Sequence, residues 1–208
     1  MSHGSTFAPT DRLPAGPLIG RLVWVRHPAL RTVLQLAVGV AFLAALAQLR
    51  LQIGPVPITG QTLGVLLIGG AYGATLGVAT TALYLVVGAA GVAVFSGGAA
   101  GLSVLSGPTG GYLLAFPLAA AVVGALAVRG WDRSVPRAAA AMAIGTVLIY
   151  AVGLAWLARF APDLGTTLAW GLWPFLPGDL LKIAAAAGAL PLAWRWLGRD
   201  RPDPSPGG

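Results

Sequence analysis

The sequence predicts an all-α integral membrane protein, built as a bundle of six transmembrane helices. The 208-residue chain is 57% hydrophobic and only 9% charged, whereas roughly 25% of the residues in an ordinary soluble domain carry charge. Its mean hydropathy is +0.81, and too little polar surface is available to cover such a chain in water. We expect a polar cytoplasmic tail over residues 1–31, one membrane domain over 32–197 and a second cytoplasmic tail over 198–208.

Apolar runs between polar or proline-containing breaks define the predicted spans. Residues 63–95 contain no charge over 33 positions, which is too long for one straight span and short for two. The glycine-rich segment 69–73 is the expected break, and one tilted helix followed by a re-entrant piece is the alternative. The predicted spans are 32–49, 63–71, 74–94, 113–128, 138–157 and 178–196.

The distribution of arginine supports an even number of spans. Basic residues cluster before residue 32, in the loop 129–137 and after residue 194, whereas the other loops carry only Arg50 and Arg159. Six spans place the three basic segments on one side, so the positive-inside rule predicts that both termini are cytoplasmic. Although the net charge is +7, this placement also argues against nucleic-acid binding, which needs a basic groove.

Several kinds of chemistry lack the residues that they need. The chain has no cysteine and no glutamate, and its two histidines, His3 and His27, precede the first span. We therefore expect no metal site, no cofactor and no catalytic residues, and an intramembrane enzyme would have to rely on hydroxyls and one acid–lysine pair. No Walker motif is present, so any ATP-driven transport needs a partner that hydrolyses ATP.

Asp179 and Lys182 are the main candidates for a binding site. Lys182 is the only lysine, and Asp179 is the only acid close to a predicted span. Residues three apart share one face of a helix, and charge at membrane depth costs at least about 2.5–3.5 kcal/mol per residue. The pair therefore either binds a ligand that has a carboxylate and hydrogen-bond donors, or is a structural pair that caps the helix and reaches the headgroups.

Two uncharged loops are expected on the same side as Asp179. These are GPVPITGQT (54–62), where two prolines exclude a helix, and the Gly- and Ser-rich segment 95–112. Such loops can fold over a small molecule and offer it backbone groups. In the first span, Ala37, Ala41 and Ala45 form a small-residue stripe that suits a close helix contact, either within the bundle or with a partner.

Four motifs together resemble the BioY family, the biotin-binding S-components of energy-coupling factor (ECF) transporters. They are GPVPITGQT (54–62), YLVVGAAGVAVFSGG (84–98), GPTGGYL (107–113) and PFLPGDLLK (174–182), in the same order and at similar spacing as in that family. The resemblance spans roughly residues 54–185. It implies a six-helix S-component in a bacterial or archaeal cell membrane that captures biotin from outside. It also implies two kinds of partner, a transmembrane coupling subunit and two cytoplasmic ATPase subunits.

The resemblance also assigns roles to residues. Asp179 and Lys182 would hold the ligand, with Lys182 facing the valerate carboxylate and Asp179 accepting from the ureido N–H groups. Residues 55–62 would form a lid, which Gly60 would loosen, because the family usually has a larger apolar residue there. The alanine stripe would contact the coupling subunit. The expected ligand-binding residues are Asp179, Lys182, Thr59, Gln61, Tyr84, Phe95, Ser96 and Tyr112, of which Ser96 departs from the family pattern and Tyr84 alternatively packs in the core.

Three other functions stay open at this point. One is an S-component for a different small vitamin, although PGDLLK (177–182) together with GPTGGY (107–112) favours biotin. A second is a stand-alone secondary transporter, which should show an inverted repeat that is not evident. The third is the intramembrane enzyme considered above, which the residue inventory disfavours.

Overall fold

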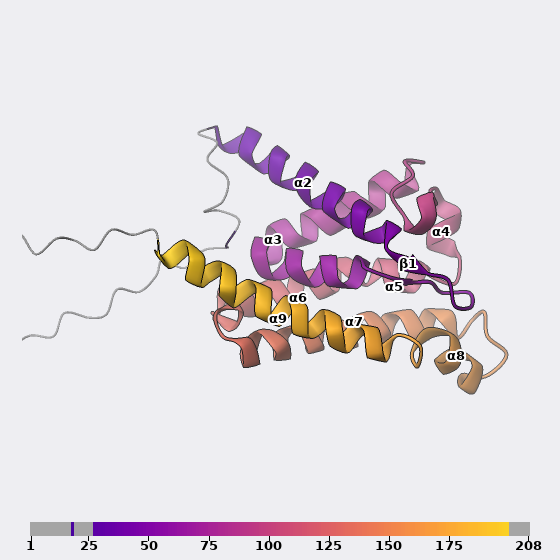
Figure 1. The fold of residues 1–208 in the computed structure, drawn as a ribbon. Helices are drawn as coiled ribbons and strands as arrows, with labels where there is room; N and C mark the ends of the chain where they lie inside the picture. Colours follow the sequence, from indigo (N-terminus) through magenta and orange to yellow (C-terminus); the bar gives the residue numbers. More distant parts are fainter. Residues whose placement is uncertain (1–17, 19–26, 200–208) are drawn as a thin grey trace, which may run out of the picture.

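The computed structural model describes residue 18 and residues 27–199, and these form a bundle of helices (Figure 1). The helices are α2 Pro28–Gln48, α3 Gln61–Ala89, α4 Leu102–Ser106, α5 Gly110–Leu114, α6 Phe116–Val128, α7 Val135–Leu157, α8 Leu164–Gly171 and α9 Leu176–Arg199. Two 3-10 turns, η1 Ser96–Gly98 and η2 Trp131–Arg133, complete the helical elements. The prediction of an all-α protein is confirmed.

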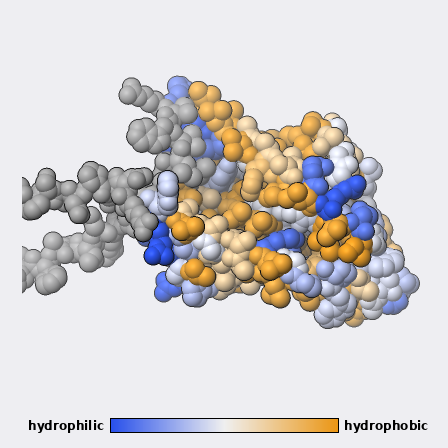
Figure 2. Space-filling view, viewed as in Figure 1, coloured by the Kyte–Doolittle hydropathy of each residue, from blue (hydrophilic) through white to orange (hydrophobic). Residues whose placement is uncertain are grey.

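Five of the described helical segments are long and apolar enough to cross a membrane. They are α2, α3, α5 continued by α6, α7 and α9 up to Trp196. Large apolar side chains on their outer faces are exposed, among them Val38 at 61%, Val147 at 64% and Leu180 at 68%. Such exposure suits a lipid solvent, and the space-filling view shows apolar residues over much of the visible face with hydrophilic residues gathered towards its two ends (Figure 2).

Helix α3 is broken at Gly73, inside the segment where the sequence predicted a break. Gly73 has φ 76° and ψ 176°, which is not helical. The side chains of Gln61 and Tyr84 are hydrogen-bonded at 2.8 Å, although a straight helix would separate them by about 34 Å at 1.5 Å per residue. The two halves of α3 therefore run antiparallel, and the chain turns back at Gly73 (Figure 1). The count of six membrane crossings depends on each half being a crossing, and it stays a prediction.

Small residues make the turn in α3 possible. Gly73 occupies the left-handed half of φ space, which glycine enters readily. The turn packs so closely on helix α6 that a Cβ at Gly124 would collide with the backbone of Gly73 and Ala74. Helices α3 and α6 form the most extensive helix pair of the bundle, so the turn lies against a rigid neighbour.

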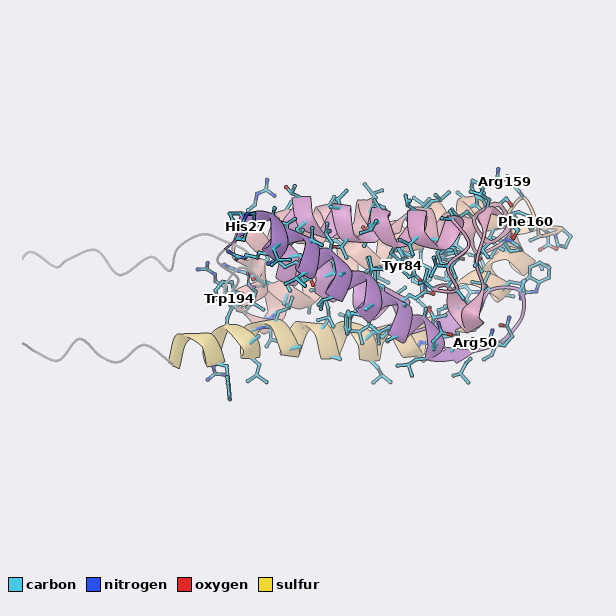
Figure 3. The ribbon with its side chains drawn as sticks, turned by 90° about the horizontal axis from the view of Figure 1, so that it is seen from above. His27, Arg50, Tyr84, Arg159, Phe160 and Trp194 are labelled. Carbon is cyan, nitrogen blue, oxygen red and sulfur yellow. The ribbon has the colours of Figure 1, made fainter. Side chains whose placement is uncertain are left out.

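The bundle has two distinct ends (Figure 3). His27 and Trp194 lie at one end, and Arg50, Arg159 and Phe160 lie at the other. The first helix therefore starts, and the last helix finishes, at the same end. Which side of the membrane this end faces is a prediction from the arginine distribution. The predicted tails 1–31 and 198–208 fall largely outside the described residues.

The loops at the Arg50 end contain more regular structure than the sequence predicts. The GPVPITGQT segment lies in a hairpin in which β1 Arg50–Leu51 pairs antiparallel with β2 Ile58–Thr59. The segment 95–112, expected as a loop, holds η1, α4 and the start of α5. Glycines with positive φ occur inside η1, at Gly97 and Gly98, and directly before α4, at Gly101. Such short helices have no amphipathic period that a sequence pattern could reveal.

Candidate ligand-binding site

A cavity of about 230 Å³ lies inside the bundle beneath the hairpin loop. The hairpin, the segment 95–99, helices α3 to α7 and the start of α9 all contribute to its walls. Its volume far exceeds the ~10–15 Å³ that one water molecule needs. The structure brings seven of the eight predicted ligand-binding residues to this cavity, namely Asp179, Lys182, Thr59, Gln61, Phe95, Ser96 and Tyr112.

Asp179 is the centre of the polar part of the cavity. This residue is 4% exposed. Lys182 Nζ lies 2.7 Å from Asp179 Oδ1, and this is the one salt bridge found among residue 18 and residues 27–199. Tyr150 Oη donates to Asp179 Oδ2, and Thr62 Oγ1 lies 3.5 Å from Oδ1. Both oxygens of this buried carboxylate are thus hydrogen-bonded, as a buried charge requires.

The position of Asp179 and Lys182 on α9 follows from the local sequence. Helix α9 starts at Leu176, so Asp179 lies in its first turn, where the helix dipole stabilises negative charge. The predicted i,i+3 pairing on one helix face is confirmed. Lys182 Nζ also donates to Thr62 Oγ1 at 3.0 Å, so the pair ties α9 to the first turn of α3.

Aromatic and apolar side chains form the rest of the wall. Phe95, Phe116 and Tyr150 line the cavity, as do Tyr112 and Phe175, whose rings are stacked with centroids 6.4 Å apart. Tyr112 Oη donates to the carbonyl of Gly171 at 3.0 Å, which satisfies the hydroxyl and holds the ring against the wall. A flat, largely apolar slot with a few convergent polar groups is typical of a small-molecule site.

The hairpin loop closes the cavity from the Arg50 end. Pro55, Val56 and Pro57 line the cavity, and Val56 is only 3% exposed. The backbone N–H of Gly60 donates to the carbonyls of Leu46 at 3.1 Å and Leu49 at 2.9 Å. Gly60 thus packs directly on the end of α2, where a Cβ would come within 2.8 Å of the Leu46 carbonyl oxygen, and the looser lid expected at this position stays a prediction.

Arg50 and Ser96 bring unused polar groups to the same end of the cavity. Both residues line it. The Arg50 guanidinium lies over Gly97, where it leaves no room for a Cβ, and it makes no salt bridge with a described residue. Ser96 Oγ is buried and has no hydrogen-bond partner in the described part of the chain. A buried hydroxyl without a partner is rare in folded proteins, so Ser96 is available to a bound molecule.

Tyr84 does not line the cavity, unlike the other predicted residues. It is fully buried in the second half of α3, and its hydroxyl accepts from Gln61 Nε2 and donates to the carbonyl of Val94, both at 2.8 Å. Gln61, in contrast, reaches both Tyr84 and the cavity. Tyr84 therefore lies behind the wall that Gln61 forms.

The alanine stripe of α2 faces outward. Ala37, Ala41 and Ala45 are all exposed, and only a small share of α2 is buried inside the bundle. An internal contact through this stripe was one of the two alternatives left open by the sequence. The exposure excludes an internal contact through this stripe, and the contact with a partner protein stays a prediction.

Sequence reasoning missed two residues of the polar cluster, Thr62 and Tyr150. Thr62 stood in a recognised motif but was assigned only to the lid. Tyr150 lies inside a run of apolar residues, where a tyrosine usually packs in the core. The only available signal for Tyr150 was its buried hydroxyl, which needs a partner in lipid, and no spacing rule connects it to Asp179 on another helix.

Comparison with known proteins agrees with this geometry. A model of the BioY family matches residues 20–199. The chain belongs to the BioY family. It is 36% identical over 150 residues to the probable biotin transporter BioY of Pyrococcus horikoshii, which covers 72% of this chain and 88% of that protein. It is 39% identical over 141 residues to the biotin transporter BioY of Rhizobium etli, which covers 64% of this chain and 75% of the relative.

A solved structure shares the fold. The crystal structure of the S-component for biotin from an ECF-type ABC transporter superposes with a TM-score of 0.73 and 26% sequence identity, over 83% of this chain and 95% of that one. The predicted family and the S-component type of fold are thus confirmed. The BioY relatives are transporters, in line with the prediction that the chain is not an enzyme. This BioY protein is a multi-pass membrane protein.

Proposed function

We propose that this BioY protein is the biotin-binding subunit of an ECF-type vitamin uptake transporter. The observation that carries the proposal is the cavity whose lining combines the polar cluster of Asp179, Lys182, Tyr150 and Thr62 with several aromatic side chains. Biotin combines a ureido group, a largely apolar fused ring and an anionic valerate tail, and each part matches a different region of this cavity.

The ureido group fits the polar cluster around Asp179. The Asp179 carboxylate is an acceptor for ureido N–H groups, and the Lys182 ammonium and the hydroxyls of Tyr150 and Thr62 are donors for the ureido oxygen. Hydrogen bonds in which one partner is ionised are the strong ones, especially away from water. The fused ring then lies against the stacked pair Tyr112 and Phe175, which offers a flat apolar surface.

The carboxylate of the ligand fits Arg50 better than Lys182. The sequence alone favoured Lys182, but the charge of Lys182 is already compensated by Asp179 at 2.7 Å. Arg50 lines the cavity, and it has no salt-bridge partner among the residues that the structure describes. A guanidinium can bind a carboxylate in a bidentate manner, through two parallel N–H···O hydrogen bonds. Ser96, with its unpartnered hydroxyl, lies in the adjacent segment and adds a donor at this end.

The energy for uptake would come from partners. The proposed partners are a transmembrane coupling subunit and two cytoplasmic ATPase subunits, because the chain has no nucleotide-binding loop of its own. The exposed stripe Ala37, Ala41 and Ala45 is the proposed contact with the coupling subunit, since small residues allow close helix approach. With the basic end cytoplasmic, the hairpin lid faces outward in a bacterial or archaeal cell membrane and biotin enters from that side.

Calorimetry on the purified full chain in lipid nanodiscs tests the function and the orientation of the ligand together. We expect biotin to bind, and Arg50→Gln to weaken biotin about tenfold or more, because a charge-assisted hydrogen bond contributes roughly 1.5–3 kcal/mol. The uncharged amide of biotin should bind the wild type and Arg50→Gln almost equally. Arg159→Gln is the matched control, because Arg159 lies at the same end (Figure 3) but stacks on Trp156 outside the cavity.

The outcomes separate the two claims. A wild-type protein that binds no biotin overturns the proposed function. If Arg50→Gln weakens biotin and its amide alike, or if Arg159→Gln matches its effect, the carboxylate does not meet Arg50 although biotin is the ligand.

A further inference from the structure

One series of hydrogen bonds connects the lid to the segment 94–96, which also lines the cavity. Thr59 Oγ1, on strand β2 of the hairpin, donates to Gln61 Oε1 at 3.0 Å. Gln61 Nε2 donates to Tyr84 Oη at 2.8 Å, and Tyr84 Oη donates to the carbonyl of Val94 at 2.8 Å. Val94 precedes Phe95 and Ser96, which line the cavity. Tyr84 therefore lies midway between the two parts of the protein that enclose the ligand.

Packing holds this series of hydrogen bonds in place. Tyr84 is 0% exposed, and its ring meets the ring of Phe95 edge to face, with centroids 5.4 Å apart. Phe95 lies directly on Gly88, where a Cβ would collide with the aromatic ring. The hydroxyl of Tyr84 both donates and accepts, so no polar atom of the tyrosine is left over. Such fully satisfied buried networks rigidify the elements that they join.

The antiparallel fold of α3 is what makes this link possible. Gln61 belongs to the first half of α3 and Tyr84 to the second, and the turn at Gly73 brings the two residues together. The side-chain views place Tyr84 inside the bundle rather than at either end (Figure 3). The link between the lid and the Phe95–Ser96 segment thus passes through Tyr84, which lies outside the cavity lining and is fully buried.

We propose that Tyr84 is a positioning residue that locks the lid strand to the Phe95–Ser96 wall and thereby sets how long the ligand stays bound. This inference rests on the proposed binding function. Tyr84 does not touch the ligand, so it affects retention and not recognition. In this proposal, release of the ligand separates the lid from the Phe95–Ser96 segment, so loss of the hydroxyl raises the population of open protein. The effect should fall mainly on the dissociation rate, as for most changes within one interface.

The test compares Tyr84→Phe with Tyr72→Phe in the full chain, using release of fluorescent or radiolabelled biotin. Tyr72 is the matched control, because it is also a buried tyrosine of α3 whose hydroxyl donates to a backbone carbonyl, that of Gln35 at 3.1 Å. Tyr72 belongs neither to the series of hydrogen bonds nor to the cavity wall. Both variants should lower the melting temperature by similar amounts. Only Tyr84→Phe should speed dissociation, by about tenfold, with the association rate changed less than about twofold.

Gln61→Met removes the side chain that joins Thr59 to Tyr84 in the same series of hydrogen bonds, and its dissociation rate is a second test. The double variant Tyr84→Phe/Gln61→Met should dissociate no faster than the faster single variant, because both changes open one link. Unchanged dissociation in Tyr84→Phe, equal acceleration in Tyr72→Phe, or fully additive effects in the double variant would each overturn the inference. Failure of the wild type to bind biotin would instead overturn the proposed function.

Discussion

Two aspartates at opposite ends of the bundle are buried to the same extent but held in different ways. Asp179 and Asp132 are each 4% exposed. Asp179 has Lys182, Tyr150 and Thr62 around it. Asp132, in the turn η2, accepts from Trp194 Nε1 through one oxygen, while its other oxygen has no partner in the described residues. Burial alone therefore does not mark a binding site.

The difference lies in the charges that surround each carboxylate. Lys182 compensates Asp179 directly, which keeps an ionised acceptor ready inside the cavity. At the other end, the Arg133 guanidinium lies 5.1 Å from the centre of the Trp194 ring and stacks on it. Burial accordingly raises the pKa of Asp132, against the smaller lowering effects of the Trp194 hydrogen bond and of Arg133. Asp132 ties the turn between α6 and α7 to the end of α9, whereas Asp179 belongs to the cavity.

The largest expected effect concerns the compensation of Asp179. Lys182→Met should lower the free energy of unfolding by about 3–5 kcal/mol, because it leaves a buried carboxylate without its counter-charge. The double variant Asp179→Asn/Lys182→Met should lose clearly less of its free energy of unfolding, because no unpaired charge remains. Thermal unfolding in one detergent measures both. A double variant that is less stable than Lys182→Met would contradict the view that charge compensation dominates at this end.

The next largest effect is on the affinity for biotin, which should depend on Asp179 but not on Asp132. Asp179→Asn should weaken biotin binding by tenfold or more, because it removes the charged acceptor for the ureido N–H groups, and Lys182→Ala should do the same. Asp132→Asn is the matched control, and we expect it to bind biotin as the wild type does. Calorimetry at a single pH suffices. Wild-type affinity in both Asp179→Asn and Lys182→Ala would end the assignment of the site.

The smallest effect is the pH dependence at the Trp194 end. The folded-state pKa of Asp132 lies above its ordinary value of 3.8. Its contribution to stability is therefore fully present below that ordinary value and is lost as the pH rises through the folded pKa. Asp132→Asn should therefore flatten the dependence of the melting temperature on pH above pH 3.8, relative to the wild type. An unchanged slope would mean that the burial of Asp132 does not shift its titration.

The sequence predicted the helical part of the fold because apolar length and charge placement determine it. The break in α3 was predictable, since 33 uncharged residues cannot form one span and Gly73 lies in the richest glycine cluster of that run. The antiparallel arrangement of the two halves of α3 was not predictable, because a break in a helix does not specify the angle between its two halves. The two-residue strands of the hairpin were missed, since strands of this length have no alternation to detect.

The charged pair of the site could be predicted, because charge is scarce in the apolar part of the chain. An uncharged member of the site such as Tyr150 could not. Asp179 and Lys182 stood out as the only acid and the only lysine in an apolar background. Tyr150 did not, because its role depends on a contact with another helix. Arg50 was used only as a topology marker, and its place at the cavity follows from the hairpin that the sequence did not predict.

The turn at Gly73 has a consequence for biogenesis. The first half of α3, residues 61–72, is about 18 Å long at 1.5 Å per residue, which is too short to be held across a hydrocarbon layer of ~30 Å. We therefore expect it to enter the bilayer together with residues 74–89, as a helical hairpin whose backbone groups are satisfied. Gln61 and Tyr84 lie on the two arms of that hairpin, so the anchor of the lid is assembled in the same insertion step that delivers the rest of α3.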